Sequence, residues 1–156
     1  MRVDTKDILA HNDSLIRQHQ KRYDSLEADK SIVDKLAAFQ IAIPSWALGT
    51  GGTRFGRFPG GGEPRNLEEK IEDVGLLHAL NQSSGAISLH IPWDIPTDAS
   101  KIRSLASSFG LRFDAMNSNT FQDQPGQKLS YKFGSMQHVD KAVRQQAIQH
   151  NLDVIK

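Results

Sequence analysis

The sequence predicts an α/β fold with a parallel sheet, and two observations support this prediction. Short apolar runs alternate with helical periodicities three times along the 156 residues, which is the order that parallel strands with crossover helices require. The loops after the predicted strands are long and hold most of the glycines and aromatic residues, together with Asn117 and Asn119. This asymmetry is typical of a barrel or a doubly wound sheet whose site lies at the carboxyl ends of its strands.

Residues 1–38 predict a helical arm that precedes the sheet. Apolar residues recur there at three- and four-residue spacings with charges between them, and a second helix is expected over 31–38. The apolar stripe is thin, so the arm needs a larger body to lie against. Residues 39–43 are apolar and rich in β-branched side chains, which predicts a first strand that ends at Pro44.

A glycine-rich loop follows, with seven glycines and three prolines among the 22 residues 44–65. It lacks the Gly-Lys-Ser/Thr of a P-loop, and Arg54 stands where a dinucleotide fingerprint needs its last glycine. The next helix also begins too late to meet a pyrophosphate, so the loop does not favour nucleotide binding. Its aromatic residues Phe55 and Phe58 indicate that it packs on a ligand or on a neighbouring subunit.

Two further strand–helix units complete the pattern. Asn66 opens a helix, with Glu69 at the spacing of a capping box, and Gly85 ends the following turn. A second strand is expected over 86–91, and Asp98 or Thr97 caps the next helix, which stops at Gly110. The remaining predictions are a third strand over 111–116, a polar loop over 117–133 and a last helix carrying Met136, Val139, Val143, Ile148, Leu152 and Ile155.

The candidate site residues lie just beyond predicted strand ends. His90 sits one residue before the end of the second strand, near Trp93, whereas Trp46 follows the first strand and Phe121 follows the third. An imidazole exchanges protons near neutral pH, and an indole face suits the C–H face of a sugar. Each of these residues has a plain alternative as packed core. The amides of Asn117 and Asn119 suit either sugar hydroxyls or a turn.

Composition narrows the functional classes. The absence of cysteine excludes disulfide scaffolds and thiolate metal sites. A net charge of +1 gives no general attraction to nucleic acid or to anionic membrane, and neither a membrane span nor a signal peptide is visible, which predicts a cytoplasmic protein. No metal motif is present, and solvated helix faces are expected for five histidines: His11, His19, His78, His138 and His150.

Several motifs together resemble one known family. They are FQIAIPSW (39–46), GTGGTRF (49–55), FPG (58–60), GEPR (62–65), SLHIPWD (88–94), FDAMNSNTF (113–121), PGQ (125–127) and SYK (130–132). In this order they are similar to the first three strands and loops of the L-rhamnose isomerases of the Pseudomonas and Bacillus type, which are xylose-isomerase-like (β/α)8 TIM barrels. The resemblance covers about residues 39–156.

The resemblance implies an aldose–ketose isomerase that interconverts L-rhamnose and L-rhamnulose by a metal-assisted hydride shift, with Mn2+ or another divalent metal. It implies that His90 is catalytic, contacting the ring-oxygen region of the sugar and assisting ring opening. Trp46 and Phe121 are then pocket walls, and Trp93 is a substrate-side neighbour of His90. Phe55 lies on the loop that reaches the active site of an adjacent subunit, as expected of a homotetramer or other homo-oligomer.

The chain departs from the family in one respect. The family's metal ligands come from later strands, and no such strands are found in 156 residues. We therefore expect the N-terminal part of a barrel, with a helical arm over 1–38 and three βα units over 39–156, which alone is inactive and holds no metal. The alternative is a non-catalytic sugar-binding or assembly module that keeps the aromatic wall. A small doubly wound nucleotide binder is a third, remote option.

Overall fold

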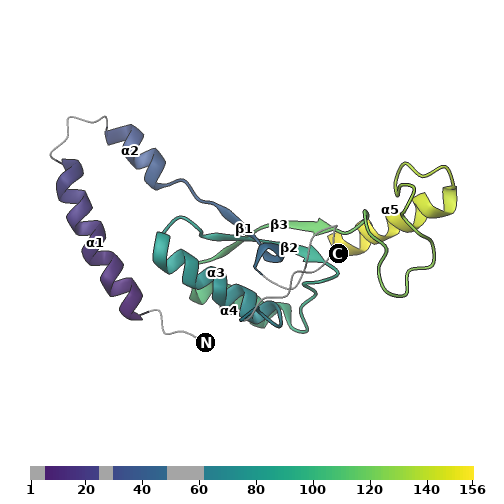
Figure 1. Ribbon diagram of the computed structural model, residues 1–156, viewed down its shortest axis with the longest axis horizontal. Coiled ribbons are helices and arrows are strands. Elements are labelled where there is room, and N and C mark those ends of the chain that lie inside the picture. The colour runs from purple at the N-terminus through teal and green to yellow at the C-terminus, as the bar shows by residue number, and fades with distance from the viewer. Residues whose placement is uncertain (1–5, 25–29, 49–61) are drawn as a thin grey trace.

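A parallel three-stranded sheet forms the centre of the protein. The computed structural model describes residues 6–24, 30–48 and 62–156. In this structure β1 (Ala42–Pro44), β2 (Ala86–Ile91) and β3 (Arg112–Ser118) lie in the order β1-β2-β3, and both pairings are parallel (Figure 1). Three strands and their parallel pairing are thus as expected from the sequence. They do not test whether a barrel closes, which stays a prediction.

Two helices cover one face of this sheet and form the main core with it. They are α3 (Leu67–Asn81) and α4 (Ala99–Ser108), which lie side by side beneath the strands (Figure 1). The core consists of apolar side chains from both layers, namely Leu67, Ile71, Val74, Ile87, Leu89, Ile102, Ala106 and Leu111. Burial of this apolar surface is what holds the helices against the sheet.

The ends of both helices follow from local side-chain chemistry. The Asn66 side chain accepts from the Glu69 amide, and Asp98 accepts from the first amides of α4, so both caps lie where the sequence predicts them. The Glu69 carboxylate bonds the Arg65 amide at 2.7 Å instead of closing the capping box on Asn66. Gly85 ends the turn directly before β2, as expected, whereas the C-cap of α3 is Gln82, which takes the left-handed conformation (φ 57°).

The helical arm is present and lies against α3. It consists of α1 (Lys6–Asp24) and α2 (Lys30–Ala37). The buried Asn12 amide donates to the carbonyls of Ala79 and Leu80, which fastens α1 to the carboxyl end of α3. Across the described residues, no helix combines the length and the apolarity that crossing a bilayer requires.

The last helix, α5 (Lys141–Ile155), projects beyond the sheet and packs on its own preceding loop (Figure 1). Val143 and Ala147 form a second small cluster with Tyr131 and Leu129. The predicted start of this helix is wrong, because Met136 and Val139 precede it and are exposed. Asp140 instead caps α5 by accepting from the Ala142 amide at 2.8 Å.

The boundaries of two strands, β1 and β3, also differ at both ends from those expected. β1 begins only at Ala42 and includes Pro44. Proline has no N–H to donate, and an edge strand tolerates this because one of its sides has no neighbouring strand. Phe39 and Ile41 lie outside it and are exposed. β3 runs on through Asn117 and Ser118, so these residues belong to the strand and not to the following loop.

We predict that Gly75→Ala destabilises the fold, because α3 and α4 meet closely at this glycine. A Cβ on Gly75 would lie 2.6 Å from Cγ and Cδ1 of Phe109 and 3.0 Å from its Cβ. Overpacking of this kind costs about 1–3 kcal/mol, which outweighs the gain of about 0.5–1 kcal/mol in helix propensity. Urea denaturation measures the effect. In a Phe109→Ala background the same substitution should become neutral or stabilising, and an equal loss in both backgrounds would contradict the steric explanation.

Candidate functional site

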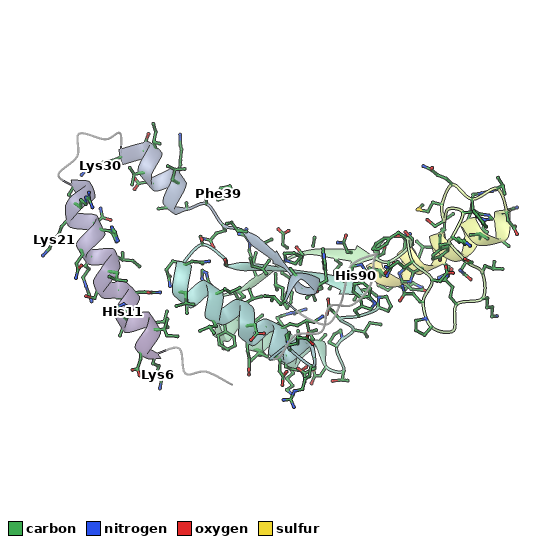
Figure 2. The ribbon with its side chains drawn as sticks, in the orientation of Figure 1. Lys6, His11, Lys21, Lys30, Phe39 and His90 are labelled. Atoms are coloured by element: carbon green, nitrogen blue, oxygen red, sulfur yellow. The ribbon has the colours of Figure 1, made fainter. Side chains whose placement is uncertain are left out.

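His90 lies at the carboxyl end of β2, where the sequence places it (Figure 2). It pairs with Asn117 of β3 and is 2% exposed. Both of its ring nitrogens are buried and have no hydrogen-bond partner among the described residues. Buried polar atoms are normally hydrogen-bonded, so an imidazole with two bare nitrogens is a candidate to receive a ligand.

Three aromatic rings from three loops surround this imidazole. Trp93 stacks on His90, with ring centroids 4.1 Å apart and planes inclined by 16°. Trp46, in the 3-10 turn η1 (Ser45–Ala47), meets it edge-on at 5.3 Å, and Phe121 does so at 5.7 Å. The structure therefore brings four of the five predicted site residues together. Phe55 lies outside the described residues.

The exposure of these rings shows which side of the site is open. Phe121 is 64% exposed and Trp93 is 36% exposed, whereas His90 is enclosed. The alternative interpretation, that these residues are ordinary packed core, therefore describes His90 better than it describes Phe121. An exposed aromatic ring in contact with a buried, unpartnered imidazole is the arrangement expected of a pocket wall.

The surroundings of His90 favour its neutral form. Burial lowers the pKa of His90 below its ordinary value, since the cation loses its hydration. The Asp94 carboxylate acts in the opposite direction, while the positive charges of Lys70 and His150 add to the lowering of this pKa. At neutral pH the ring therefore carries one N–H donor and one bare acceptor nitrogen.

This lowered pKa predicts how the stability depends on pH. Between the ordinary value of about 6.5 and the lower folded value, the unfolded chain binds more protons at His90 than the folded chain does. The full contribution of His90 to the free energy of unfolding is therefore present above about pH 6.5. It is lost as the pH falls through the pKa that His90 has in the folded protein. Urea midpoints of the wild type and of His90→Phe, measured from about pH 8 to about pH 5, test this sign. The wild type should lose stability relative to the variant on acidification, and a constant difference would contradict the lowered pKa.

A buried polar network lies directly behind His90. The Asp94 carboxylate, on a side chain with no exposed surface, accepts from the Lys70 ammonium at 2.7 Å and from the His90 backbone amide at 2.7 Å. It also accepts a short hydrogen bond from the Ser45 hydroxyl. The Asp94 amide returns a bond of 2.9 Å to the His90 carbonyl. These four residues are called the Asp94 network below.

Sequence reasoning assigned no role to Asp94, Lys70 or Ser45. One signal was available, because Lys70 lies between Leu67, Ile71 and Val74 on the apolar stripe of the predicted helix. A lysine in such a stripe needs a buried partner. Nothing in the sequence indicates which carboxylate that partner is.

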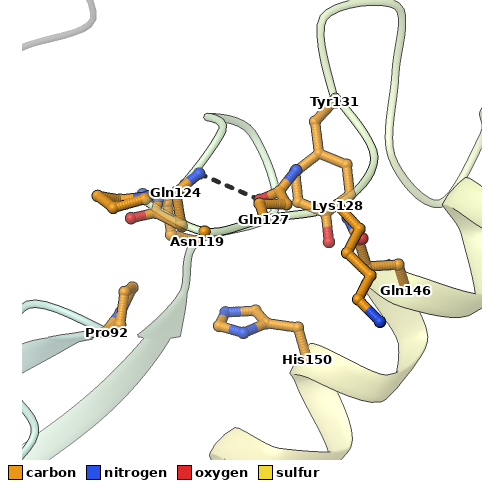
Figure 3. Close-up of a pocket in the computed structure, with 10 residues that line it drawn as sticks. Pro92, Asn119, Gln124, Gln127, Lys128, Tyr131, Gln146 and His150 are labelled. Carbon is orange, nitrogen blue, oxygen red and sulfur yellow. Dashed lines mark hydrogen bonds between the residues drawn. The ribbon is translucent and has the colours of Figure 1, made fainter.

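A polar cavity of about 430 Å³ adjoins the carboxyl ends of β2 and β3 (Figure 3). Figure 3 shows His150 projecting from α5 toward Pro92 and Asn119, with Lys128 and Gln146 beside it. The lining residues are Pro92, Asn119, Gln124, Pro125, Gly126, Gln127, Lys128, Tyr131, Gln146 and His150. Amide, hydroxyl, imidazole and ammonium groups line it without a carboxylate, which suits a ligand rich in hydroxyl groups.

The walls of this cavity are held by local hydrogen bonds. The Asn119 side chain accepts from the Phe121 and Gln122 amides, so the turn alternative describes Asn119 correctly. Asp123 accepts from the Ser130 hydroxyl and the Tyr131 amide, both at 2.6 Å, and these bonds lower the pKa of Asp123. These hydrogen bonds hold the loop that carries Phe121 in a defined conformation.

Three of the five predictions of solvated helical histidines are wrong. His138 lies before α5, where its Nδ1 accepts from the Asp140 amide at 2.9 Å. The ring atoms His78 Nδ1 and His150 Nε2 are buried without hydrogen-bond partners among the described residues. Tertiary packing, which the helical periodicity of a single segment does not reveal, covers these two rings.

The described residues do not fit the divalent metal that the resemblance implies. Within the ranges 6–24, 30–48 and 62–156, no group of three or more His, Asp or Glu side chains is placed to hold a metal ion. The buried carboxylate nearest to His90, that of Asp94, is already used by Lys70, Ser45 and the His90 amide. The described residues therefore offer no complete set of metal ligands.

Two curated proteins are similar to this chain over nearly its whole length. One, from Rhizobium meliloti (strain 1021), is 49% identical over 151 residues and is named a probable sugar isomerase. Another, from Mesorhizobium japonicum, is 52% identical over 143 residues and is also named a probable sugar isomerase. The chain spans 35% and 32% of the lengths of these relatives. No protein-family model matches the chain.

Proposed function

We propose that the protein acts as a sugar isomerase, and more specifically as an aldose–ketose isomerase that interconverts L-rhamnose and L-rhamnulose. One observation carries this proposal. His90 is buried, neither of its ring nitrogens has a hydrogen-bond partner among the residues that the structure describes, and Trp46, Trp93 and Phe121 surround it. The names of relatives at about half identity support a sugar isomerase in general, and the motif resemblance supports the rhamnose reaction.

The chemistry of this site suits the opening of a sugar ring. Opening a pyranose breaks the bond between the anomeric carbon and the ring oxygen. The ring oxygen gains a proton, and the anomeric hydroxyl loses one. A neutral imidazole can donate from one nitrogen and accept at the other, and in the described part of the chain no protein group occupies either nitrogen of His90.

The surroundings of His90 suit the rest of a sugar. The Trp93 and Trp46 rings offer apolar faces to C–H groups. The polar cavity, which is lined by residues other than His90 and its three rings, adjoins them through Pro92 and Asn119. Its groups, such as the Tyr131 hydroxyl and the Lys128 ammonium, suit sugar hydroxyls. In this proposal Phe55 of a neighbouring subunit completes the pocket.

The hydride shift that follows ring opening belongs to the same proposal but not to the described residues. A divalent metal such as manganese would polarise the substrate oxygens and stabilise the developing negative charge. Its ligands would have to come from residues other than those that the structure describes.

The test is an isomerase assay on the complete gene product. L-Rhamnose is incubated with the protein after chelation and after addition of manganese, cobalt, zinc or magnesium, and L-rhamnulose is measured by NMR. L-Mannose and D-allose, which differ in hydroxyl geometry, serve as comparison sugars. We expect interconversion that requires a metal and is fastest with L-rhamnose. Saturable sugar binding without turnover would favour the sugar-binding module instead, and neither binding nor turnover would refute both proposals.

A further inference from the structure

The Asp94 network joins three separate elements at one buried carboxylate. Ser45 comes from η1, Lys70 from α3, and the His90 amide from β2. Asp94 is 1% exposed and Lys70 is also buried, so these bonds are shielded from water. Charge-assisted bonds in such surroundings are strong and fix geometry.

Every member of this network except Lys70 adjoins or carries a ring of the candidate site. Ser45 directly precedes Trp46, and Asp94 directly follows Trp93. The third point is the backbone of His90 itself. The carboxylate therefore ties together the backbone segments that carry the edge-on ring, the imidazole and the stacked ring.

We infer that Asp94 is a positioning residue of the His90 site, which holds Trp46 and Trp93 against the imidazole without touching the substrate. Its Oδ1 accepts from Lys70, and its Oδ2 accepts from Ser45 and His90, so the carboxylate faces the protein and not a ligand. The expected effect of Asp94 on sugar turnover rests on the proposed function. The expected effect of Asp94 on the placement of the two tryptophan rings is independent of it.

The first test uses fluorescence, since Trp46 and Trp93 are the two tryptophans of the chain and both contact His90. Protonated histidine quenches a tryptophan in contact with it. Emission of the 156-residue chain should therefore titrate with a midpoint below the ordinary histidine pKa of about 6.5, and this transition should be absent in His90→Phe.

The test variant is Ser45→Ala, which removes one donor to Asp94 without changing any charge. If Asp94 positions the rings, loosening it admits water to His90. The emission midpoint should then rise toward the ordinary value, and the emission maximum should move to longer wavelength. Asp114→Asn is the matched control, because Asp114 lies exposed on β3 and, among the described residues, its side chain makes only a long hydrogen bond of 3.4 Å with Ser88. The control should leave both readouts unchanged.

A second variant removes both charges of the network and keeps the shapes of the side chains. Asp94→Asn with Lys70→Met avoids leaving either charge buried alone. In the complete gene product we expect kcat/KM for L-rhamnose to fall on the order of tenfold to a hundredfold, as displaced reacting groups do. If Ser45→Ala and this double variant fold but keep the wild-type midpoint and emission, Asp94 is a structural ion pair only, and the inference is wrong. If the wild type has no isomerase activity but the midpoint moves, the proposed function fails and the positioning role stands.

Discussion

His90→Phe should abolish most of the isomerase activity of the complete gene product while leaving the fold intact. Phenylalanine keeps a ring between Trp46 and Trp93 but removes both nitrogens to which the proposed function assigns the opening of the sugar ring. General acid–base groups contribute on the order of 10² to 10⁴ in rate, and we expect a loss of kcat in this range. The KM should change little, because the aromatic contacts to the sugar remain.

The measurement is initial-rate kinetics with L-rhamnose, supported by near-ultraviolet circular dichroism to show that the rings remain packed. His19→Phe is the matched control, since His19 lies exposed on α1. It should retain wild-type rates. If the His90→Phe protein folds and keeps full activity, His90 takes no part in the reaction.

Lys70→Met should cause the largest loss of stability among single substitutions near the site. The variant leaves the Asp94 carboxylate buried without its cation, because Lys70 Nζ is its ion-pair partner at 2.7 Å. Breaking a buried pair from one side typically costs about 3–5 kcal/mol, a large part of the roughly 5–15 kcal/mol that holds a domain folded. Urea denaturation of the 156-residue chain measures this loss of unfolding free energy.

Two further variants show whether the ion pair is responsible. Lys101→Met breaks an exposed pair with Glu68 at 3.7 Å and should cost less than about 1 kcal/mol. Adding Asp94→Asn to Lys70→Met should restore part of the lost stability, since the unpaired charge disappears. If Lys70→Met costs no more than Lys101→Met, the Lys70–Asp94 pair is not a buried contact in solution.

The sequence predicted the fold best where a single physical pattern dominates. Residues 86–91 are mostly apolar, with Ala86, Ile87, Leu89 and Ile91, and β2 occupies these residues. Asn66 and Asp98 cap helices where expected, because capping depends on local hydrogen bonds. The end of β3 was predicted wrongly because asparagine is a residue type common in turns. The place of Asn117 in the strand is set instead by its pairing with His90 of β2.

The site was predictable to the extent that it depends on strand ends. Parallel strands finish at one edge, so His90 and the rings beyond neighbouring strands were expected to meet. The distances confirm that they do, although their roles in catalysis stay predictions. The Asp94 network escaped notice because it joins residues 24 and 49 positions apart in the chain. The burial of His150 Nε2 escaped for the same reason, since it depends on which loop covers that part of the helix.

The most direct test is a crystal structure of the complete gene product with L-rhamnose. If our interpretation is right, the sugar lies against Trp46, Trp93 and Phe121, and a nitrogen of the His90 ring is within hydrogen-bond distance of the ring oxygen or the anomeric hydroxyl. Electron density for the sugar at another place, with both His90 nitrogens still unpartnered, would contradict it.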